Sequence, residues 1–297
     1  MRAFEYYAAT DARHAVALLA EHAPARVLAG GTDLLADLKG STHGPKAVVD
    51  ISRATDMRRL ERSSRGLVIG ALVTHSEIMA SPLVRELFPA LVDAAHTIGA
   101  VQTRNLGTLG GNLVTAVPSM DSGPTLVALD ARVTIAGPGG NRDVPLAEFF
   151  VGPRKTVLKP DELLVDILIP QENLGKPAHF LKFGLRKGQA LALVNAAASF
   201  RLDAKKNICS DVRIALGAVA PTVIRAPAAE KFLEGRAATE ENFAEAGRRA
   251  VGDARPISDF RATAEYRKDL VAVLVKRALA GACAQAKSAK ASKGARS

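Results

Sequence analysis

Two Gly-Gly pairs, Gly30-Gly31 and Gly110-Gly111, constrain this chain more than any other feature of its sequence. The first pair follows a short apolar run, residues 26–29, and precedes residues 34–38, whose leucines have helical spacing. Consecutive glycines at such a strand-to-helix junction remove the steric barrier of Cβ, so several backbone N–H groups can point into one concavity. The start of the helix adds partial positive charge, which favours a phosphate or diphosphate as ligand.

The second pair lies in a glycine-rich stretch, residues 107–112, which we expect to be a turn. Thr32 and Asn112 follow the two pairs and add side-chain hydrogen-bond donors. For either pair alone, a tight turn that serves only packing is the favoured explanation. Two such pairs in separate lobes predict a two-sided clamp, in which backbone amides from both sides close on a diphosphate.

The apolar pattern predicts an N-terminal domain of two α/β-like lobes, then a smaller α+β domain. Residues 1–176 form the first domain, with lobes at about 1–55 and 56–176. Residues 177–285 form the second, and a basic tail, 286–297, is expected to be disordered. The expected strands are 26–29, 47–51, 67–71, 133–136, one from 144, 163–169, 191–202 and 212–219. The expected helices are 11–21, 34–38, a short one after Thr74 or Ser76, a long one over 84–98, 226–233, 240–251 and 262–280.

Composition excludes several classes of protein. The length of 297 residues fits about two domains, and 48% hydrophobic with 24% charged residues is ordinary for a globular chain. Of the net charge of +10, four charges lie in the tail, and the aromatic content is only 4% without Trp, which disfavours nucleic-acid binding. No apolar run is long enough to span a membrane, and the N-terminus does not resemble a signal peptide. We therefore expect a cytoplasmic protein.

Several kinds of catalytic or cofactor site lack their sequence signatures. The chain has no G-x-G-x-x-G after a strand, no phosphate-binding P-loop, no H-E-x-x-H and no G-x-S-x-G. The six histidines show no metal-ligand spacing. The two cysteines, Cys209 and Cys283, are too few for the four thiolates that an iron–sulfur cluster usually takes. Neither a metal site nor a catalytic residue is expected in this chain.

Three motifs occur in order and carry a family resemblance: Ala29–Leu35 (AGGTDLL), Ile69–His75 (IGALVTH) and Thr108–Asn112 (TLGGN). The chain thereby resembles the FAD-binding medium subunits of the molybdenum hydroxylases, the xanthine dehydrogenase and carbon monoxide dehydrogenase family. The resemblance spans nearly the whole chain except the basic tail. It continues through Asp161–Leu164, the strand that ends at Pro170, Phe180–Phe183, Ile214–Pro221, Arg225-Ala226 and Glu230.

The resemblance implies a fold and a set of cofactor-binding residues. The fold is a two-lobed FAD-binding domain of the vanillyl-alcohol-oxidase/PCMH type, followed by a C-terminal α+β domain of the CO dehydrogenase flavoprotein type. Met120 stands where relatives often have Ser or Ala before the acid, so Ser119 is the available hydroxyl. The implied residues are Ala29, Gly30, Gly31, Thr32, Asp33, Leu34, Leu35, Thr108, Gly110, Gly111 and Asn112 at the pyrophosphate, Asp121 at the adenosine half with Thr115 near the same wall, Ile98 and Gly99 against the cofactor, Leu164 beside the nucleotide, and Lys182 on the flavin side.

The resemblance also implies a role in electron transfer. A large partner subunit would carry a molybdenum cofactor, and a small one [2Fe-2S] clusters from which FAD receives electrons for an external acceptor. A dimer of such heterotrimers is expected. Two alternatives remain: a self-sufficient flavin oxidase of the same fold, and a non-catalytic assembly subunit without FAD.

Overall fold

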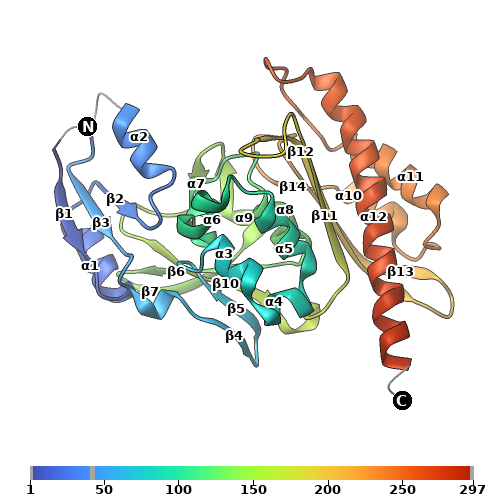
Figure 1. Ribbon diagram of the computed structural model, residues 1–297, viewed down its shortest axis with the longest axis horizontal. Helices are drawn as coiled ribbons and strands as arrows, with labels where there is room; N and C mark the ends of the chain where they lie inside the picture. Colours follow the sequence, from blue (N-terminus) through green and yellow to red (C-terminus); the bar gives the residue numbers. More distant parts are fainter. Residues whose placement is uncertain (1–2, 41–43, 295–297) are drawn as a thin grey trace.

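The computed structural model describes residues 3–40 and 44–294, with side chains up to residue 288. A small N-terminal lobe lies at one end of the molecule, a second lobe lies in the middle, and the C-terminal domain lies at the other end (Figure 1). Each part is built around its own sheet. The cavity described below lies between the two N-terminal lobes.

The small lobe is a parallel three-stranded sheet of order β1-β3-β2 with two helices. Asp11 caps α1 by accepting a hydrogen bond from the backbone N–H of His14, as the sequence suggests. Val48 packs with the leucines of α2, whereas Val49 is part of the main core. The elements are β1 (Glu5–Ala8), α1 (Ala12–Glu21), β2 (Ala25–Leu28), α2 (Leu34–Gly40) and β3 (Ala47–Asp50).

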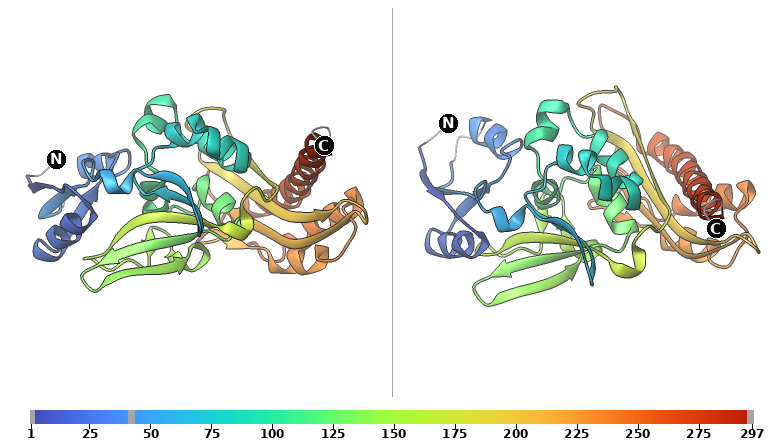
Figure 2. Two further views of the ribbon diagram at one scale, coloured as in Figure 1. Left: turned by 90° about the horizontal axis from the view of Figure 1, so that it is seen from below. Right: turned by 60° about the horizontal axis from the view of Figure 1, so that its bottom comes forward.

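The second lobe holds a five-stranded antiparallel sheet of order β4-β5-β10-β6-β7. Figure 2 shows helices α3, α4 and α5 stacked on one side of this sheet. The strands are β4 (Leu60–Ser63), β5 (Gly66–Gly70), β6 (Arg132–Gly137), β7 (Gly140–Pro145) and β10 (Leu163–Pro170), with a ribbon of β8 (Phe150–Gly152) and β9 (Lys155–Thr156). The helices are η1 (Thr55–Met57), α3 (His75–Ala80), α4 (Pro82–Leu87), α5 (Pro89–His96), α6 (Val101–Leu106), α7 (Leu109–Thr115), α8 (Ser122–Ala128), α9 (Leu146–Phe149) and η2 (Gln171–Asn173).

The expected long helix over 84–98 is wrong, because two helices occupy this stretch. α4 ends at Leu87, and Pro89 is the first residue of α5. Proline has no backbone N–H and clashes with the preceding turn, so it starts a helix more readily than it continues one. Phe88, between the helices, has an extended φ of −142° and is buried.

The C-terminal domain is an antiparallel sheet of order β11-β12-β13-β14 covered by three helices. Buried Val271, Val275, Ala278 and Ala282 recur at helical spacing on α12 and belong to the core that this helix shares with the sheet. The elements are β11 (Ala178–Gly184), β12 (Ala192–Asp203), β13 (Ile208–Gly217), β14 (Ile224–Arg225), α10 (Pro227–Leu233), α11 (Glu240–Ala250) and α12 (Ala264–Gly294). The expected domain boundary falls between β10 and β11.

The expectation of disorder from residue 286 is wrong for the described part of the tail. Helix α12 continues to Gly294, well past the expected end at residue 280, and Ala286 is buried. Alanine and lysine are strong helix formers, and neither Gly nor Pro interrupts the sequence between Gly281 and Gly294. Residues 295–297 of the expected tail lie outside the described residues.

Candidate functional site

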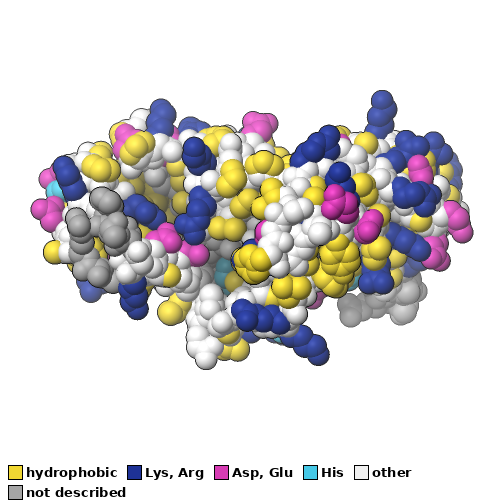
Figure 3. Space-filling model, turned by 90° about the horizontal axis from the view of Figure 1, so that it is seen from above, with side chains coloured by type: hydrophobic (Ala, Val, Ile, Leu, Met, Phe, Trp, Pro, Cys, Tyr) yellow, Lys and Arg dark blue, Asp and Glu magenta, His cyan; other side chains and the backbone are white. Residues whose placement is uncertain are grey.

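A cavity of about 400 Å³ lies between the small lobe and the second lobe, and both glycine pairs line it. The two segments are in direct contact, since a Cβ added to Gly30 would lie 1.7 Å from the carbonyl oxygen of Leu106. Figure 3 shows the upper face of the molecule hollowed between these lobes, with basic and acidic side chains at the edge. Of the sequence-predicted residues, the cavity is lined by Ala29, Gly30, Gly31, Thr32, Asp33, Leu34, Ile98, Thr108, Gly110, Gly111, Asn112, Thr115 and Leu164.

The loop of residues 30–34 presents a run of free backbone donors to this cavity. Within the described residues, the N–H groups of Gly30, Gly31, Thr32, Asp33 and Leu34 have no hydrogen-bond partner. Gly31 has a φ of +72°, a left-handed conformation in which a Cβ is strained, so glycine is required there. Successive free amides in such a turn form a concavity that binds anions. On this side of the predicted clamp, the structure leaves the backbone donors unpaired.

The other side of the clamp differs from the prediction. Residues 109–112 form the first helical turn of α7, whereas the sequence predicts a non-helical loop there. Thr108 caps this helix. The amides of Gly110, Gly111 and Asn112 donate to Ala71 O, Thr108 Oγ1 and Thr108 O, at 2.9, 3.0 and 3.0 Å. They are therefore not free to bind a diphosphate. The expectation that both sides bind through backbone amides is wrong for this side, because helix formation and capping use these donors.

The second glycine pair contributes space instead of donors. A Cβ on Gly110 would lie 2.5 Å from Cβ of Ala71, so this glycine lets α7 pack closely against the end of β5. A Cβ on Gly111 would meet only Thr108 Oγ1, at 2.9 Å, and is otherwise unobstructed. Gly111 thus keeps the wall of the cavity open.

Asp121 and Lys182 do not line this cavity, although the sequence reading places both at the cofactor. They form a buried ion pair with 2.5 Å between Lys182 Nζ and Asp121 Oδ2. Lys182 Nζ also donates to the carbonyl of Thr97, at 3.1 Å, and Asn195 Nδ2 donates to Asp121 Oδ1, at 3.0 Å. Burial raises the pKa of Asp121, while the charge of Lys182 opposes that rise. The pair joins α8 to β11 across the two domains.

Two further predicted residues also lie outside the cavity lining. Leu35 is the second residue of α2, and its side chain packs against Gly31. Gly99 has a φ of +49°, and its carbonyl accepts a hydrogen bond from the Gln189 N–H at 3.1 Å. Both residues shape neighbouring loops.

Charged side chains of both signs line the cavity, and of these only Asp33 is predicted from the sequence as a site residue. Arg154 donates to Asp37 at 3.1 Å, so two of the charges neutralise each other. Burial raises the pKa of Asp33, and the three acidic side chains of the lining offset its three basic ones. An anion here is therefore favoured by the backbone donors more than by any excess of cationic side chains. The additional charged lining residues are Arg26, Asp37, Arg154, Lys159 and Glu162.

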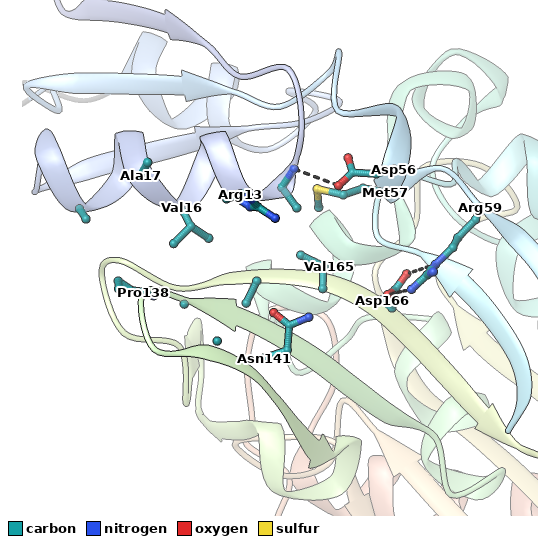
Figure 4. Close-up of a pocket in the computed structure, with 15 residues that line it drawn as sticks. Arg13, Val16, Ala17, Asp56, Met57, Arg59, Pro138, Asn141, Val165 and Asp166 are labelled. Carbon is teal, nitrogen blue, oxygen red and sulfur yellow. Dashed lines mark hydrogen bonds and ion pairs between the residues drawn. The ribbon is translucent and has the colours of Figure 1, made fainter.

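A second cavity, of about 690 Å³, lies between α1, η1, the β6–β7 hairpin and β10. Figure 4 shows Arg13 and Val16 of α1 facing Asn141 and Val165 across it. Neither glycine pair lines it, and its Asp166 carboxylate is already paired with the Arg59 guanidinium. The smaller cavity, which holds the free amides, is the better candidate site.

Among the described residues, no cluster of three or more His, Cys, Asp or Glu side chains could hold a metal ion. Cys209 and Cys283 are free and buried, and burial raises the pKa of the Cys209 thiol to about 12. No helix in the described part of the chain is long and apolar enough to cross a membrane.

Comparison with known proteins assigns the chain to a family. Residues 2–172 match the family model of the FAD binding domain in molybdopterin dehydrogenase, and residues 179–282 match that of the CO dehydrogenase flavoprotein C-terminal domain. The chain belongs to the FAD-binding medium subunits of the molybdenum hydroxylases. This result confirms the family resemblance, and the two-lobed FAD-binding domain followed by an α+β domain is confirmed as the fold.

Relatives of this medium subunit match over almost their whole length. The carbon monoxide dehydrogenase medium chain of Hydrogenophaga pseudoflava is 33% identical over 95% of this chain and 98% of its own. The xanthine dehydrogenase FAD-binding subunit of Escherichia coli O157:H7 is 33% identical over 95% of this chain and 96% of its own. Among solved structures, carbon monoxide dehydrogenase from H. pseudoflava matches with a TM-score of 0.91 and 34% identity over 96% and 98%. Quinoline 2-oxidoreductase from Pseudomonas putida 86 matches with a TM-score of 0.89 and 31% identity, over 96% of this chain and 98% of its own. The chain is an oxidoreductase subunit, and its cofactor is FAD.

Proposed function

We propose that this medium subunit holds FAD between its two N-terminal lobes and carries electrons from an iron–sulfur partner to an external acceptor. The observation that supports the site is the row of five free amides, Gly30 to Leu34, in a cavity that both lobes line. Bound FAD supplies a centre that accepts and releases electrons, while the protein binds and orients it. No acid–base residue of this chain is required for that role.

The residues fit the cofactor in a specific arrangement. The amides of Gly30 to Leu34 bind the diphosphate, and Gly111 leaves room for it to approach α7. Leu164, Ile98 and Thr115 line the walls on which the nucleotide and the remainder of the cofactor rest. Asn112 accepts from Ser122 Oγ through Oδ1, so its Nδ2 amide is available as a further donor.

Asp121 and Lys182 act in this proposal by positioning a loop. Lys182 donates a hydrogen bond to the carbonyl of Thr97, which directly precedes Ile98 and Gly99. The ion pair with Asp121 fixes Lys182, and Lys182 in turn holds the backbone of this loop in place beside the cavity. The contacts of Asp121 with the adenosine half and of Lys182 with the flavin stay predictions.

The proposed partners follow from how the chemistry is divided among chains. An iron–sulfur cluster usually takes four cysteine thiolates, and this sequence contains two cysteines. The family to which the chain belongs implies that a small [2Fe-2S] subunit supplies electrons and that a large molybdenum-cofactor subunit oxidises the substrate. A dimer of such heterotrimers is the proposed assembly. A cytoplasmic location stays a prediction.

The test is the flavin content of the purified full-length chain, alone and with co-expressed partners. We expect about one FAD per chain, with flavin absorbance that survives gel filtration, and no substrate turnover by the isolated chain. Turnover by the isolated chain would favour the self-sufficient oxidase. A folded chain that takes up no FAD when FAD is supplied would favour the assembly subunit.

Replacing Gly111 with Val should remove most bound FAD while leaving the fold intact. The new side chain enters the open wall of the cavity, and its Cβ meets only the Thr108 hydroxyl. The measurement is FAD per chain after gel filtration, beside the melting temperature. Gly139→Val, in a hairpin turn with no atom within 4 Å of an added Cβ, is the control. FAD content equal to that of the control would contradict the proposed wall.

A further inference from the structure

His75 is a buried polar residue of the cavity with a ring nitrogen that has no partner. It is the first residue of α3, is 1% exposed, and lines the cavity. Its Nδ1 atom is shielded from solvent and makes no hydrogen bond within the described residues. Buried polar atoms are nearly always hydrogen-bonded, because an unmet bond costs free energy. Nε2 also makes no hydrogen bond within the described residues, but unlike Nδ1 it is not shielded, so Nε2 is the ring nitrogen that is open to the cavity.

The ring lies beside the segment that carries the free amides. The backbone N–H of His75 donates to the carbonyl of Gly107, at 3.1 Å. A Cβ placed on Gly107 would lie 3.5 Å from Cδ2 of His75 and 3.6 Å from Oγ1 of Thr32. Cδ2 is bonded to Nε2, so this edge of the ring and the hydroxyl of Thr32 both border Gly107. Thr32 is the middle residue of the free-amide loop, 30–34.

The protonation state of the ring suits a single neutral donor. Burial, and to a smaller extent the charge of Arg104, lowers the pKa of His75 to about 4. At neutral pH the imidazole therefore has one N–H donor and one acceptor nitrogen. A neutral donor can stay in the cavity without ligand more cheaply than a buried cation.

We propose that His75 donates a hydrogen bond from Nε2 to a phosphate oxygen of the bound FAD diphosphate, beside the amides of residues 30–34. This inference rests on the proposed function, because it assigns one further residue to the same site. It adds a donor from the second lobe beside the side-chain amide of Asn112. The Gly110-Gly111 segment does not supply one, since its amides are already paired. The diphosphate is thus contacted from both lobes, by backbone groups on one side and by an imidazole on the other.

The test compares the affinities of wild type, His75→Leu and His75→Gln for FAD and for ADP, by calorimetry on the full chain freed of flavin. ADP retains the diphosphate without the flavin. We expect His75→Leu to weaken both ligands by about tenfold, the effect of losing one hydrogen bond to a charged group. His75→Gln, whose amide nitrogen reaches a position similar to Nε2, should stay within about threefold of wild type. Equal affinities of His75→Leu and wild type would overturn the proposal. An affinity of His75→Gln as low as that of His75→Leu would overturn it too.

A spectroscopic measurement separates binding from a purely structural role. In protein with ¹⁵N-labelled histidine, the His75 resonances should report the Nε2–H form, and adding ADP should raise the pKa of His75. Resonances that ADP leaves unmoved, in protein that demonstrably binds ADP, would overturn the assignment of His75 alone. A wild-type chain that binds neither FAD nor ADP would instead overturn the proposed function.

Discussion

Replacing Gly30 with Ala is expected to reduce FAD affinity by at least about a hundredfold. An alanine Cβ at this position would lie 1.7 Å from the carbonyl oxygen of Leu106 and 3.1 Å from the N atom of Gly107. Both obstacles are backbone, so the loop of residues 30–34 must move away from α6 and α7. Its amides then no longer face the opposite wall. Fluorescence titration of the flavin-free chain with FAD measures the loss.

The control for this substitution is Gly139→Ala, because an added Cβ there meets no atom within 4 Å. Circular dichroism and gel filtration should show both variants folded, with the affinity loss confined to Gly30→Ala. Wild-type affinity in Gly30→Ala would show that the contact between Gly30 and Leu106 does not set the position of the amides. It would also remove the main support for the proposed diphosphate site.

Replacing Lys182 with Met is expected to lower the free energy of unfolding by about 3 kcal/mol at neutral pH. The substitution leaves the Asp121 carboxylate buried without its cationic partner, although Asn195 still donates to it. Methionine approximates the length of the lysine chain, so the lost charge dominates over lost packing. Urea unfolding followed by circular dichroism measures the change.

The deficit in Lys182→Met should shrink as the pH falls. Burial already raises the pKa of Asp121, and removing Lys182 raises it further. A carboxyl whose folded-state pKa lies above its unfolded-state value stabilises the fold once it is protonated, and loses that contribution as pH rises through the folded-state pKa. The difference from wild type should therefore be smaller at pH 5 than at pH 8.

Adding Asp121→Asn to Lys182→Met serves as the matched control, because it removes the unpaired charge. This double variant should recover much of the lost stability and should not depend on pH in the same way. A deficit of equal size at pH 5 and pH 8, or no recovery in the double variant, would contradict a buried charge pair between the domains.

The sequence was sufficient to locate the first glycine loop, residues 30–34. It was not sufficient to predict that the backbone amides of the second glycine pair are already hydrogen-bonded. An apolar run before Gly30-Gly31 and a leucine repeat after it are local features, and they predicted β2, the loop and α2 correctly. Gly110 and Gly111 gave the same glycine signal, yet they start a helix. What decides the difference is the pairing of their amides with Ala71 and Thr108. The first of these contacts depends on tertiary structure, which a glycine count does not contain.

Residues distant in sequence account for the other differences. Asp121 and Lys182 are separated by 61 positions, and nothing local indicates that each is the other's partner. His75 lies in a motif that the sequence reading quoted, but its missing hydrogen-bond partner becomes visible only once its burial is known. β1 escaped prediction because its residues do not alternate between buried and exposed.

The shared core of the two N-terminal lobes has a consequence for synthesis. Val49 of β3 and Leu19 of α1 pack in the same core as Ile69 of β5 and Ile167 of β10, whereas the small lobe's own cluster is centred on three buried residues. A segment of that size buries too little apolar surface to be stable alone. During translation the first fifty residues emerge long before β10. They therefore cannot complete their hydrophobic core, and stay incompletely folded, until that strand leaves the ribosome. The cavity between the two lobes can therefore form only after more than half of the polypeptide has been made.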